Sequence, residues 1–207
     1  MAEKKYTPMM QHYLKMKEEN PDSILFYRLG DFYEMFFEDA KLVSQELDLV
    51  LTGRSAGVEE KVPMCGIPFH AANSYIQRLV KKGYKVAICE QLEDPSSAKG
   101  LVDRGIIKII TPGTYMDATM DAKSTNYMAS CDVSSFEITV IYCELSTGEL
   151  KYQTLQRSLV ALQKALLEQN VSELVCPMTM DKKWMAALEE MDTMLISKHK
   201  KANIDSE

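Results

Sequence analysis

The chain has 207 residues, a length that fits one large domain or two small ones. Apolar residues make up 46% and charged residues 26%, which excludes a disordered tail, a collagen-like fibre and a simple coiled coil. With 24 basic and 30 acidic side chains the net charge is −6, so charge alone does not indicate a nucleic-acid binder, which usually carries a basic surface. No apolar run approaches the ~20 residues of a membrane span, and the start MAEKKYTPMM has no apolar signal-peptide core. We therefore expect a cytoplasmic protein with no membrane partner.

The cysteines indicate reduced, mostly buried thiols. They are odd in number, widely spaced and contain no CxxC pair, which argues against a disulfide framework or a zinc site. They are Cys65, Cys89, Cys131, Cys143 and Cys176. A nucleophilic pair of His70 with Cys65 or Cys89 is an alternative, but a reactive thiol needs an electropositive surrounding that sequence does not show.

The first half of the chain predicts a mixed α/β unit. Thr7 and Pro8 suit the start of a helix, and Gly83 suits the end of another. We expect helices over about 8–20, 34–47 and 71–82, strands over 24–29, 48–53, 64–68, 84–91 and 106–111, and loops at 54–63 and 94–97. Arg28, inside the first strand, predicts an internal ion pair with Asp31 or Asp39.

The second half predicts another α/β unit. The expected strands are 127–131, 136–145, 149–154 and 174–177, and the expected helices are 160–167 and 183–191. The polar stretch 114–125 is typical of a linker. No strand is predicted after the last helix, so this unit reads as cut short.

Motifs for several enzyme classes are absent. The sequence holds no GxxxxGKS/T phosphate loop, no GxGxxG after a strand, no HExxH and no GxSxG. Asp132 and Glu144 lie on two predicted neighbouring strands, and carboxylates so placed can hold metal ions in a nuclease. The alternative, which we favour, puts Asp132 at a strand end and Glu144 on a solvent face.

The segment GDFYEMFF, residues 30–37, places aromatic and acidic side chains at a predicted strand-to-helix turn. A purely structural interpretation is available. In it Phe36 belongs to the core, Phe32 and Tyr33 cover the base of the helix, and Glu34 favours the positive end of the helix dipole.

Four segments in this order carry a resemblance to a known family: FYRLGDFYEMFFEDA, VPMCGIPFHA, VAICEQLEDP and KGLVDRGIIKIITPGT. Together with TPMMQHYLKMK they resemble the N-terminal part of the MutS family of bacterial DNA mismatch repair proteins. The resemblance covers about residues 7–125, and YCELSTGEL at 142–150 resembles the start of the family's connector domain. It implies two small mixed α/β domains: a mismatch-recognition domain over 1–115, a linker over 116–125, and an incomplete RNase H-like connector over 126–207.

The resemblance assigns roles to two residues. The family's Phe-x-Glu motif falls on Phe32 and Glu34, so Phe32 would stack on a mispaired or unpaired base and Glu34 would hydrogen-bond to it. Residues i and i+2 of an extended segment face the same way, so both side chains can enter one groove while Tyr33 points away and serves structure.

The resemblance also suggests weaker DNA contacts. Arg54 would reach phosphate or the minor groove, with a solvated loop charge as the alternative. Met64, Gly66 and His70 lie in the segment that lines the DNA side in the family. Gly66 would permit close approach of backbone, and His70 could equally cap the following helix.

Members of the family are several times longer than this chain. We therefore expect a fragment that is no enzyme and carries no cofactor, with ATP and Mg²⁺ bound by an ATPase domain of a longer parent. The expected partners are duplex DNA with mismatches or small insertion/deletion loops, MutL, and a second MutS subunit. The expected location is the bacterial cytoplasm, at the nucleoid. A connector module that binds MutL, or a metal-dependent nuclease, is the alternative function.

Overall fold

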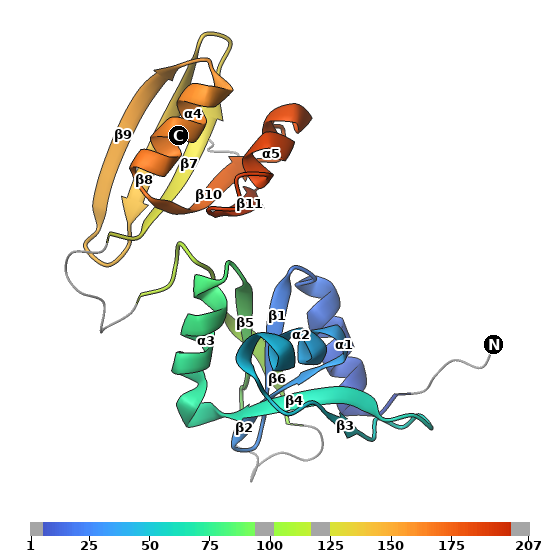
Figure 1. Cartoon of the computed structure of the whole chain (residues 1–207). Helices are drawn as coiled ribbons and strands as arrows, with labels where there is room; N and C mark the ends of the chain where they lie inside the picture. The colour runs from blue at the N-terminus through green and yellow to red at the C-terminus, as the bar shows by residue number, and fades with distance from the viewer. Residues whose placement is uncertain (1–5, 94–101, 117–124, 200–207) are drawn as a thin grey trace, which may run out of the picture. The chain divides into compact units, whose positions relative to one another are not determined.

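The computed structural model describes residues 6–93, 102–116 and 125–199, which form two compact units, Met1–Ile110 and Thr111–Glu207 (Figure 1). The first contains α1 (Pro8–Glu19), β1 (Ser23–Leu29), β2 (Phe32–Phe36), α2 (Phe37–Leu47), β3 (Thr52–Arg54), β4 (Val62–Pro68), the 3-10 turn η1 (Phe69–Ala71), α3 (Ala72–Lys81), β5 (Lys85–Gln91) and β6 (Arg104–Ile110). The second contains β7 (Tyr127–Val133), β8 (Glu137–Glu144), β9 (Glu149–Gln156), α4 (Leu159–Glu168), β10 (Val171–Pro177), α5 (Lys182–Glu189) and β11 (Leu195–His199). The predicted fold class of two mixed α/β units is confirmed. The predicted loop 94–97 and most of the predicted linker lie outside the described residues.

The first unit is built on a six-stranded sheet with strand order β3-β4-β2-β1-β5-β6. β1 and β5 run parallel, and the other neighbouring strands are antiparallel. Leu25 and Tyr27 of β1 pack with α1 in one apolar core. Ile24 and Phe26 are buried on the opposite face, because successive side chains of a strand alternate. Both faces of the central strand are therefore covered.

The segment after the Gly30-Asp31 turn differs from the sequence prediction. We predicted a helix from Glu34, but Phe32–Phe36 is strand β2 and the helix begins only at Phe37. β2 pairs with β1 on one side and β4 on the other, and these distant partners override the helical spacing of the apolar residues. Phe37 has a φ of 54°, in the left-handed region, and turns the chain from strand into helix.

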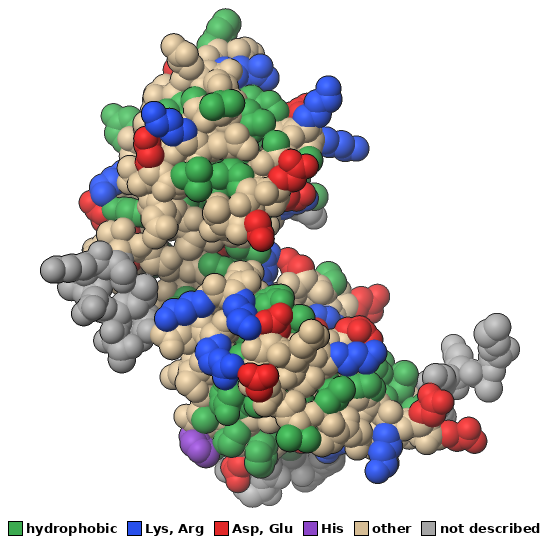
Figure 2. Space-filling model, in the orientation of Figure 1, with side chains coloured by type: hydrophobic (Ala, Val, Ile, Leu, Met, Phe, Trp, Pro, Cys, Tyr) green, Lys and Arg blue, Asp and Glu red, His purple; other side chains and the backbone are tan. Residues whose placement is uncertain are grey.

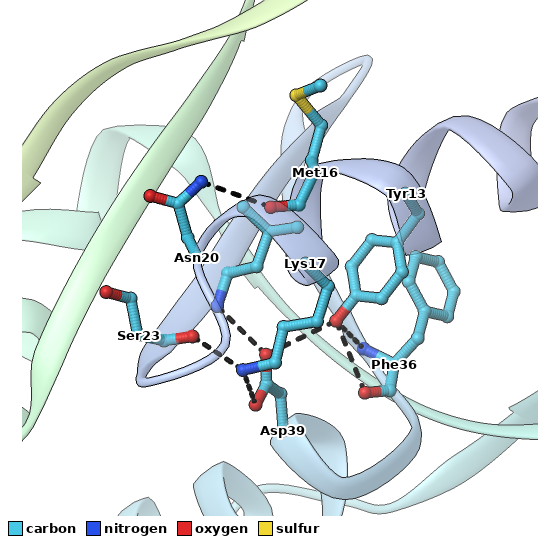
Figure 3. A network of polar contacts seen from close by, with 8 residues as sticks. Tyr13, Met16, Lys17, Asn20, Ser23, Phe36 and Asp39 are labelled. Atoms are coloured by element: carbon cyan, nitrogen blue, oxygen red, sulfur yellow. Dashed lines mark hydrogen bonds and ion pairs between the residues drawn. The ribbon is translucent and has the colours of Figure 1, made fainter.

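A buried carboxylate joins α1, β1 and α2 (Figure 3). Asp39, in the first turn of α2, is 7% exposed. It accepts hydrogen bonds from the Leu25 N–H at 3.0 Å and from Lys17 Nζ at 2.9 Å. Lys17 Nζ also donates to the Ser23 carbonyl at 2.6 Å. One negative charge thus ties two helices to the start of the central strand, in a helix turn that favours it.

Tyr13 completes this junction. Its hydroxyl accepts from the Phe36 N–H at 3.3 Å and lies 3.4 Å from Asp39 Oδ2. The ring packs edge-on against Phe36, with 4.9 Å between ring centres. Burial, together with the negative charge of Asp39, raises the pKa of Tyr13 far above its usual value. The hydroxyl therefore stays protonated and satisfies backbone groups where β2 ends and α2 begins.

Replacing Asp39 by Ala should destabilise the junction of α1, β1 and α2. The substitution leaves the Lys17 ammonium and the Leu25 N–H without their acceptor. We expect the free energy of unfolding to fall by about 2–4 kcal/mol, near the cost of breaking a buried ion pair. Urea unfolding followed by circular dichroism measures this. Glu38→Ala is the control, because the Glu38 side chain is 84% exposed; an equal loss in both variants would contradict the role of Asp39.

The second unit is built on a five-stranded sheet with strand order β11-β10-β7-β8-β9. β7, β8 and β9 are antiparallel neighbours, and β10 runs parallel to both β7 and β11. α4 and α5 bury Leu162, Leu166, Met185 and Leu188 in a core shared with the sheet. The helices of this unit therefore pack on the sheet face that carries its apolar core.

The prediction that no strand follows the last helix is wrong. β11 pairs with β10 from Glu173–Leu195 to Pro177–His199. The sequence LISKH is short and half polar, so it gave no strand signal of its own. The parallel neighbour β10 supplies the backbone partners, and the predicted half-sheet is a five-stranded one.

The second unit begins at Thr111, whereas the predicted domains were 1–115 and 126–207. Glu173 of β10 is 3% exposed and fastens the start of this unit to the sheet. It accepts hydrogen bonds from the Thr111 hydroxyl, from the Gly113 N–H at 3.2 Å and from the Ser197 hydroxyl at 2.5 Å. The segment 111–113 is therefore part of the second unit.

Gly113→Ala should destabilise the second unit. A Cβ at Gly113 would lie 2.8 Å from the Glu173 Cβ and 3.0 Å from the Met128 Cβ. Both are held by strands, so no side-chain rotation relieves the clash. We expect a loss of about 1–3 kcal/mol, the usual cost of overpacking, measured by thermal unfolding. Gly66→Ala is the control, because its Cβ would have its nearest neighbour at 3.4 Å; similar losses would show that close packing at Gly113 is not the cause.

Candidate nucleic-acid interface

The β1–β2 hairpin presents Phe32 directly after a two-residue turn. Leu29 pairs with Phe32 across Gly30 and Asp31. Gly30 has a φ of +57°, which glycine adopts without a Cβ clash. Phe32 is 47% exposed, although large aromatic side chains are usually well buried. The turn thus holds an aromatic ring at the end of a strand, open to solvent.

Glu34 lies on the same face of β2 as Phe32, two residues further along. The residues that alternate with them, Tyr33 and Met35, are buried. The Tyr33 hydroxyl donates to Glu90 of β5, and burial raises the pKa of Tyr33 to about 12. The prediction that Tyr33 points away and serves structure is confirmed. Glu34 does not lie at a helix start, because α2 begins only at Phe37.

Arg54, Met64 and Gly66 border Glu34. Gly66 pairs directly with Glu34 across β2 and β4, and Met64 lies two residues away on β4. Arg54, at the end of β3, forms an ion pair with Glu34, whose side chain is 15% exposed against 36% for Arg54. The alternative of an unpaired, solvated loop charge at Arg54 is therefore wrong, whereas its contact with DNA stays a prediction. A Cβ at Gly66 would lie 3.5 Å from Glu34 Cγ, so a larger residue there would crowd the Glu34 side chain.

His70 follows the strand that pairs with Phe32. It lies in η1 and is exposed, and its ring meets the Phe69 ring edge-on, with 5.9 Å between ring centres. The Phe69 N–H donates to the Asp31 carbonyl at 2.9 Å, which brings η1 beside the turn. The alternative in which His70 caps α3 is wrong, because the N-cap is Ala71 and no side chain caps it.

Arg28 holds the same turn. Its Nε donates to the Gly30 carbonyl at 2.5 Å, and its guanidinium carbon lies 3.7 Å from the centre of the Phe69 ring. Its Nη1 lies 3.4 Å from Glu90 Oε1. The predicted internal ion pair exists, but its partner is Glu90 and not Asp31 or Asp39. The parallel pairing of β1 with β5 brings in this carboxylate, which the sequence order hides.

This arrangement places an exposed aromatic ring and an ion-paired carboxylate on one face of β2. Among residues 6–93, 102–116 and 125–199, no three His, Cys, Asp or Glu side chains gather where they could hold a metal ion. Figure 2 shows basic and acidic side chains interspersed on the visible surface, with no continuous basic patch on that side. The exposed ring can stack on a flat group, and the carboxylate beside it can accept a hydrogen bond from that group.

The nuclease alternative is not favoured by the geometry. Asp132 pairs with Thr139, whereas Glu144 pairs with Tyr127 at the other end of the same two strands. Glu144 is buried and closes the β8–β9 turn, where it accepts from the Thr147 N–H at 2.7 Å. Hydrogen bonds from the Thr147 and Ser146 hydroxyls lower the pKa of the Glu144 carboxyl. This carboxylate is already occupied by its own turn.

The thiols of Cys65 and Cys89 are also unsuited to nucleophilic chemistry. All five cysteines are free. Burial raises the pKa of Cys65 to about 12 and that of Cys89 to about 11, so the reactive thiolate is disfavoured.

Comparison with known proteins identifies the family. The family model "MutS domain I" matches residues 7–119, which is more than half of the chain. The chain belongs to the MutS family. A "DNA mismatch repair protein MutS" from Clostridium botulinum (strain Loch Maree / Type A3) is 54% identical over 177 residues, which cover 81% of this chain and 19% of the relative. The MutS of Clostridium tetani (strain Massachusetts / E88) is 58% identical over 146 residues, covering 70% of this chain and 17% of the relative.

The chain spans about a fifth of the length of these MutS relatives. The matched stretch contains the whole Phe32 hairpin and its neighbours on β3, β4 and η1. In the described part of the chain, no helix has both the length and the apolar character needed to cross a membrane.

Arg28→Ala should loosen the turn that carries Phe32. It removes the hydrogen bond to Gly30 and the stacking on Phe69, and it leaves Glu90 without its cation. We expect a stability loss of about 1–3 kcal/mol, as for other hydrogen bonds to charged groups, and faster amide exchange at Phe69. Hydrogen exchange followed by NMR measures the second effect. Arg78→Ala, at an exposed position of α3, is the control. Unchanged exchange at Phe69 in Arg28→Ala would contradict the role of Arg28 in holding the turn.

Proposed function

We propose that the first unit recognises mispaired or unpaired bases in duplex DNA. Phe32 stacks on the base from the minor groove, and Glu34 hydrogen-bonds to it. The observation that carries this proposal is the placement of Phe32. It is a half-exposed aromatic ring at a braced turn, on the same strand face as an acidic side chain.

The physics of an aromatic wedge explains how a lesion is distinguished. Inserting an apolar side chain between base pairs costs a few kcal/mol of unstacking and kinks the duplex. A mispaired base is already weakly stacked and weakly paired, so insertion costs less there. Sequence-dependent deformability is then read as energy, and the ring accepts any base because every base has a π-face.

Glu34 adds discrimination by making ordinary duplex less attractive. A carboxylate near phosphates is repelled and weakens binding to all DNA. Among the groups of the DNA itself, only a displaced base that offers a donor compensates for this repulsion. Weaker binding to all DNA, combined with an added hydrogen bond only at a lesion, increases specificity for the lesion.

The surrounding side chains support this contact. Arg54 and His70 supply polar groups beside the hairpin, and Met64 and Gly66 offer a smooth surface on β4. We assign these four residues to the DNA-facing side of the first unit. The acidic balance of the chain agrees with weak binding to undamaged duplex.

Phe32→Ala should abolish the preference for a lesion. We expect this chain to bind a duplex with one G·T mismatch or one unpaired T more tightly than the perfect duplex, and the variant to bind both equally. Fluorescence anisotropy at low salt measures this, because few phosphate contacts are expected and binding weakens as salt rises.

Phe136→Ala is the matched control, since Phe136 is an exposed phenylalanine of the second unit. It should leave the preference unchanged. Equal binding of all duplexes by the unsubstituted chain, or a preference that survives in Phe32→Ala, would overturn the proposal.

Further functions can be proposed for a longer MutS polypeptide that contains this domain. We propose that a MutS polypeptide with this sequence binds ATP and Mg²⁺ outside these residues, pairs with a second MutS subunit, and works at the bacterial nucleoid. We assign the second unit to the connector, with MutL as its partner. The name and length of the MutS relatives support this, and pull-down of MutL by residues 111–207 tests the connector role.

A further inference from the structure

Glu34 has a partner before any DNA is bound. Arg54 Nη1 and Glu34 Oε2 form an ion pair that links the end of β3 to the middle of β2. The two residues share one face of the sheet with Met64 and Gly66 of the intervening strand β4. Gly66 carries no side chain, so nothing from its position stands between the guanidinium and the carboxylate.

This ion pair changes what Glu34 can do. A carboxylate paired with a guanidinium is largely neutralised, and it repels phosphates less than a bare one does. A guanidinium is also a strong, directional donor. A displaced base must therefore compete with Arg54 for the same oxygen atoms before it can bind Glu34.

We propose that Arg54 is a specificity-determining residue that acts by occupying Glu34. In the free protein and on undamaged duplex, the ion pair stays closed. At a lesion the base takes over the carboxylate and displaces Arg54 from it. This inference rests on the proposed function, since it concerns the same site.

An Arg54 that occupies Glu34 differs from an Arg54 that only contacts phosphate in its effect on specificity. A residue that only contacts phosphate contributes the same amount on any duplex, so its loss weakens all complexes equally. Loss of an occupant of Glu34 instead leaves the carboxylate bare. Binding to perfect duplex then weakens more than binding to a lesion, because only the lesion offers the carboxylate a new partner.

The experiment is a double-mutant cycle read as a ratio of affinities. Anisotropy at low salt gives the Kd for perfect duplex divided by the Kd for unpaired-T duplex, for the chain, Arg54→Ala, Glu34→Ala and the double variant. We expect Arg54→Ala to raise this ratio at least threefold when Glu34 is present. In the Glu34→Ala background it should leave the ratio unchanged.

Two further variants serve as controls. Lys61→Ala removes the same charge from an exposed position of the same β3–β4 hairpin, and should weaken both complexes equally. Arg54→Gln repeats the test with a neutral side chain of similar length, in case Arg54→Ala is unstable in thermal unfolding.

Each outcome bears on one proposal. If the unsubstituted chain prefers the lesion but Arg54→Ala and Arg54→Gln leave the ratio unchanged, the role of Arg54 is overturned and the proposed function stands. The same holds if the ratio changes equally with and without Glu34. If the unsubstituted chain shows no lesion preference, the proposed function fails, and the role of Arg54 fails with it.

Discussion

The buried carboxylate of Asp39 sets the geometry of the first unit. It binds the Leu25 amide of the central strand and the Lys17 ammonium of α1 from the first turn of α2. A buried charge needs such partners because an unpaired one is very costly in an apolar interior. The network leaves one point at which β2 can end and α2 begin. The position of that point fixes which residues of β2 face the solvent.

The alternation of side chains along β2 determines which residues form the surface that we propose to contact DNA. Once Phe36 is fixed in the core beneath Tyr13, strand geometry places Glu34 and Phe32 on the same face, two and four residues earlier. α1 packs over the end near Phe36, whereas Phe32 remains half exposed. The exposure of the ring therefore follows from where the covering helix ends.

The charged side chains around this surface form isolated ion pairs. Glu34 is matched by Arg54, and Arg28 on the neighbouring strand is matched by Glu90. A protein that grips DNA by its phosphates needs many unpaired cations. This chain has a net charge of −6. Its Arg28 instead stabilises the hairpin, and its Arg54 pairs with the Glu34 carboxylate. Under the proposed function, such a surface discriminates between duplexes and does not bind all of them tightly.

The sequence by itself determined the composition class, most helices and strands, and the family, because local signals and ordered motifs carry that information. Thr7 and Pro8 start α1 as predicted, and the motif around Phe32 indicated the candidate site. Strand β2, strand β11 and the partner of Arg28 were decided only by the tertiary structure. Each depends on a neighbouring strand that is distant in sequence: β4 for β2, β10 for β11, and β5 for the Arg28–Glu90 pair. Backbone pairing between distant segments leaves no periodic trace in either segment alone, and so only the folded chain shows it.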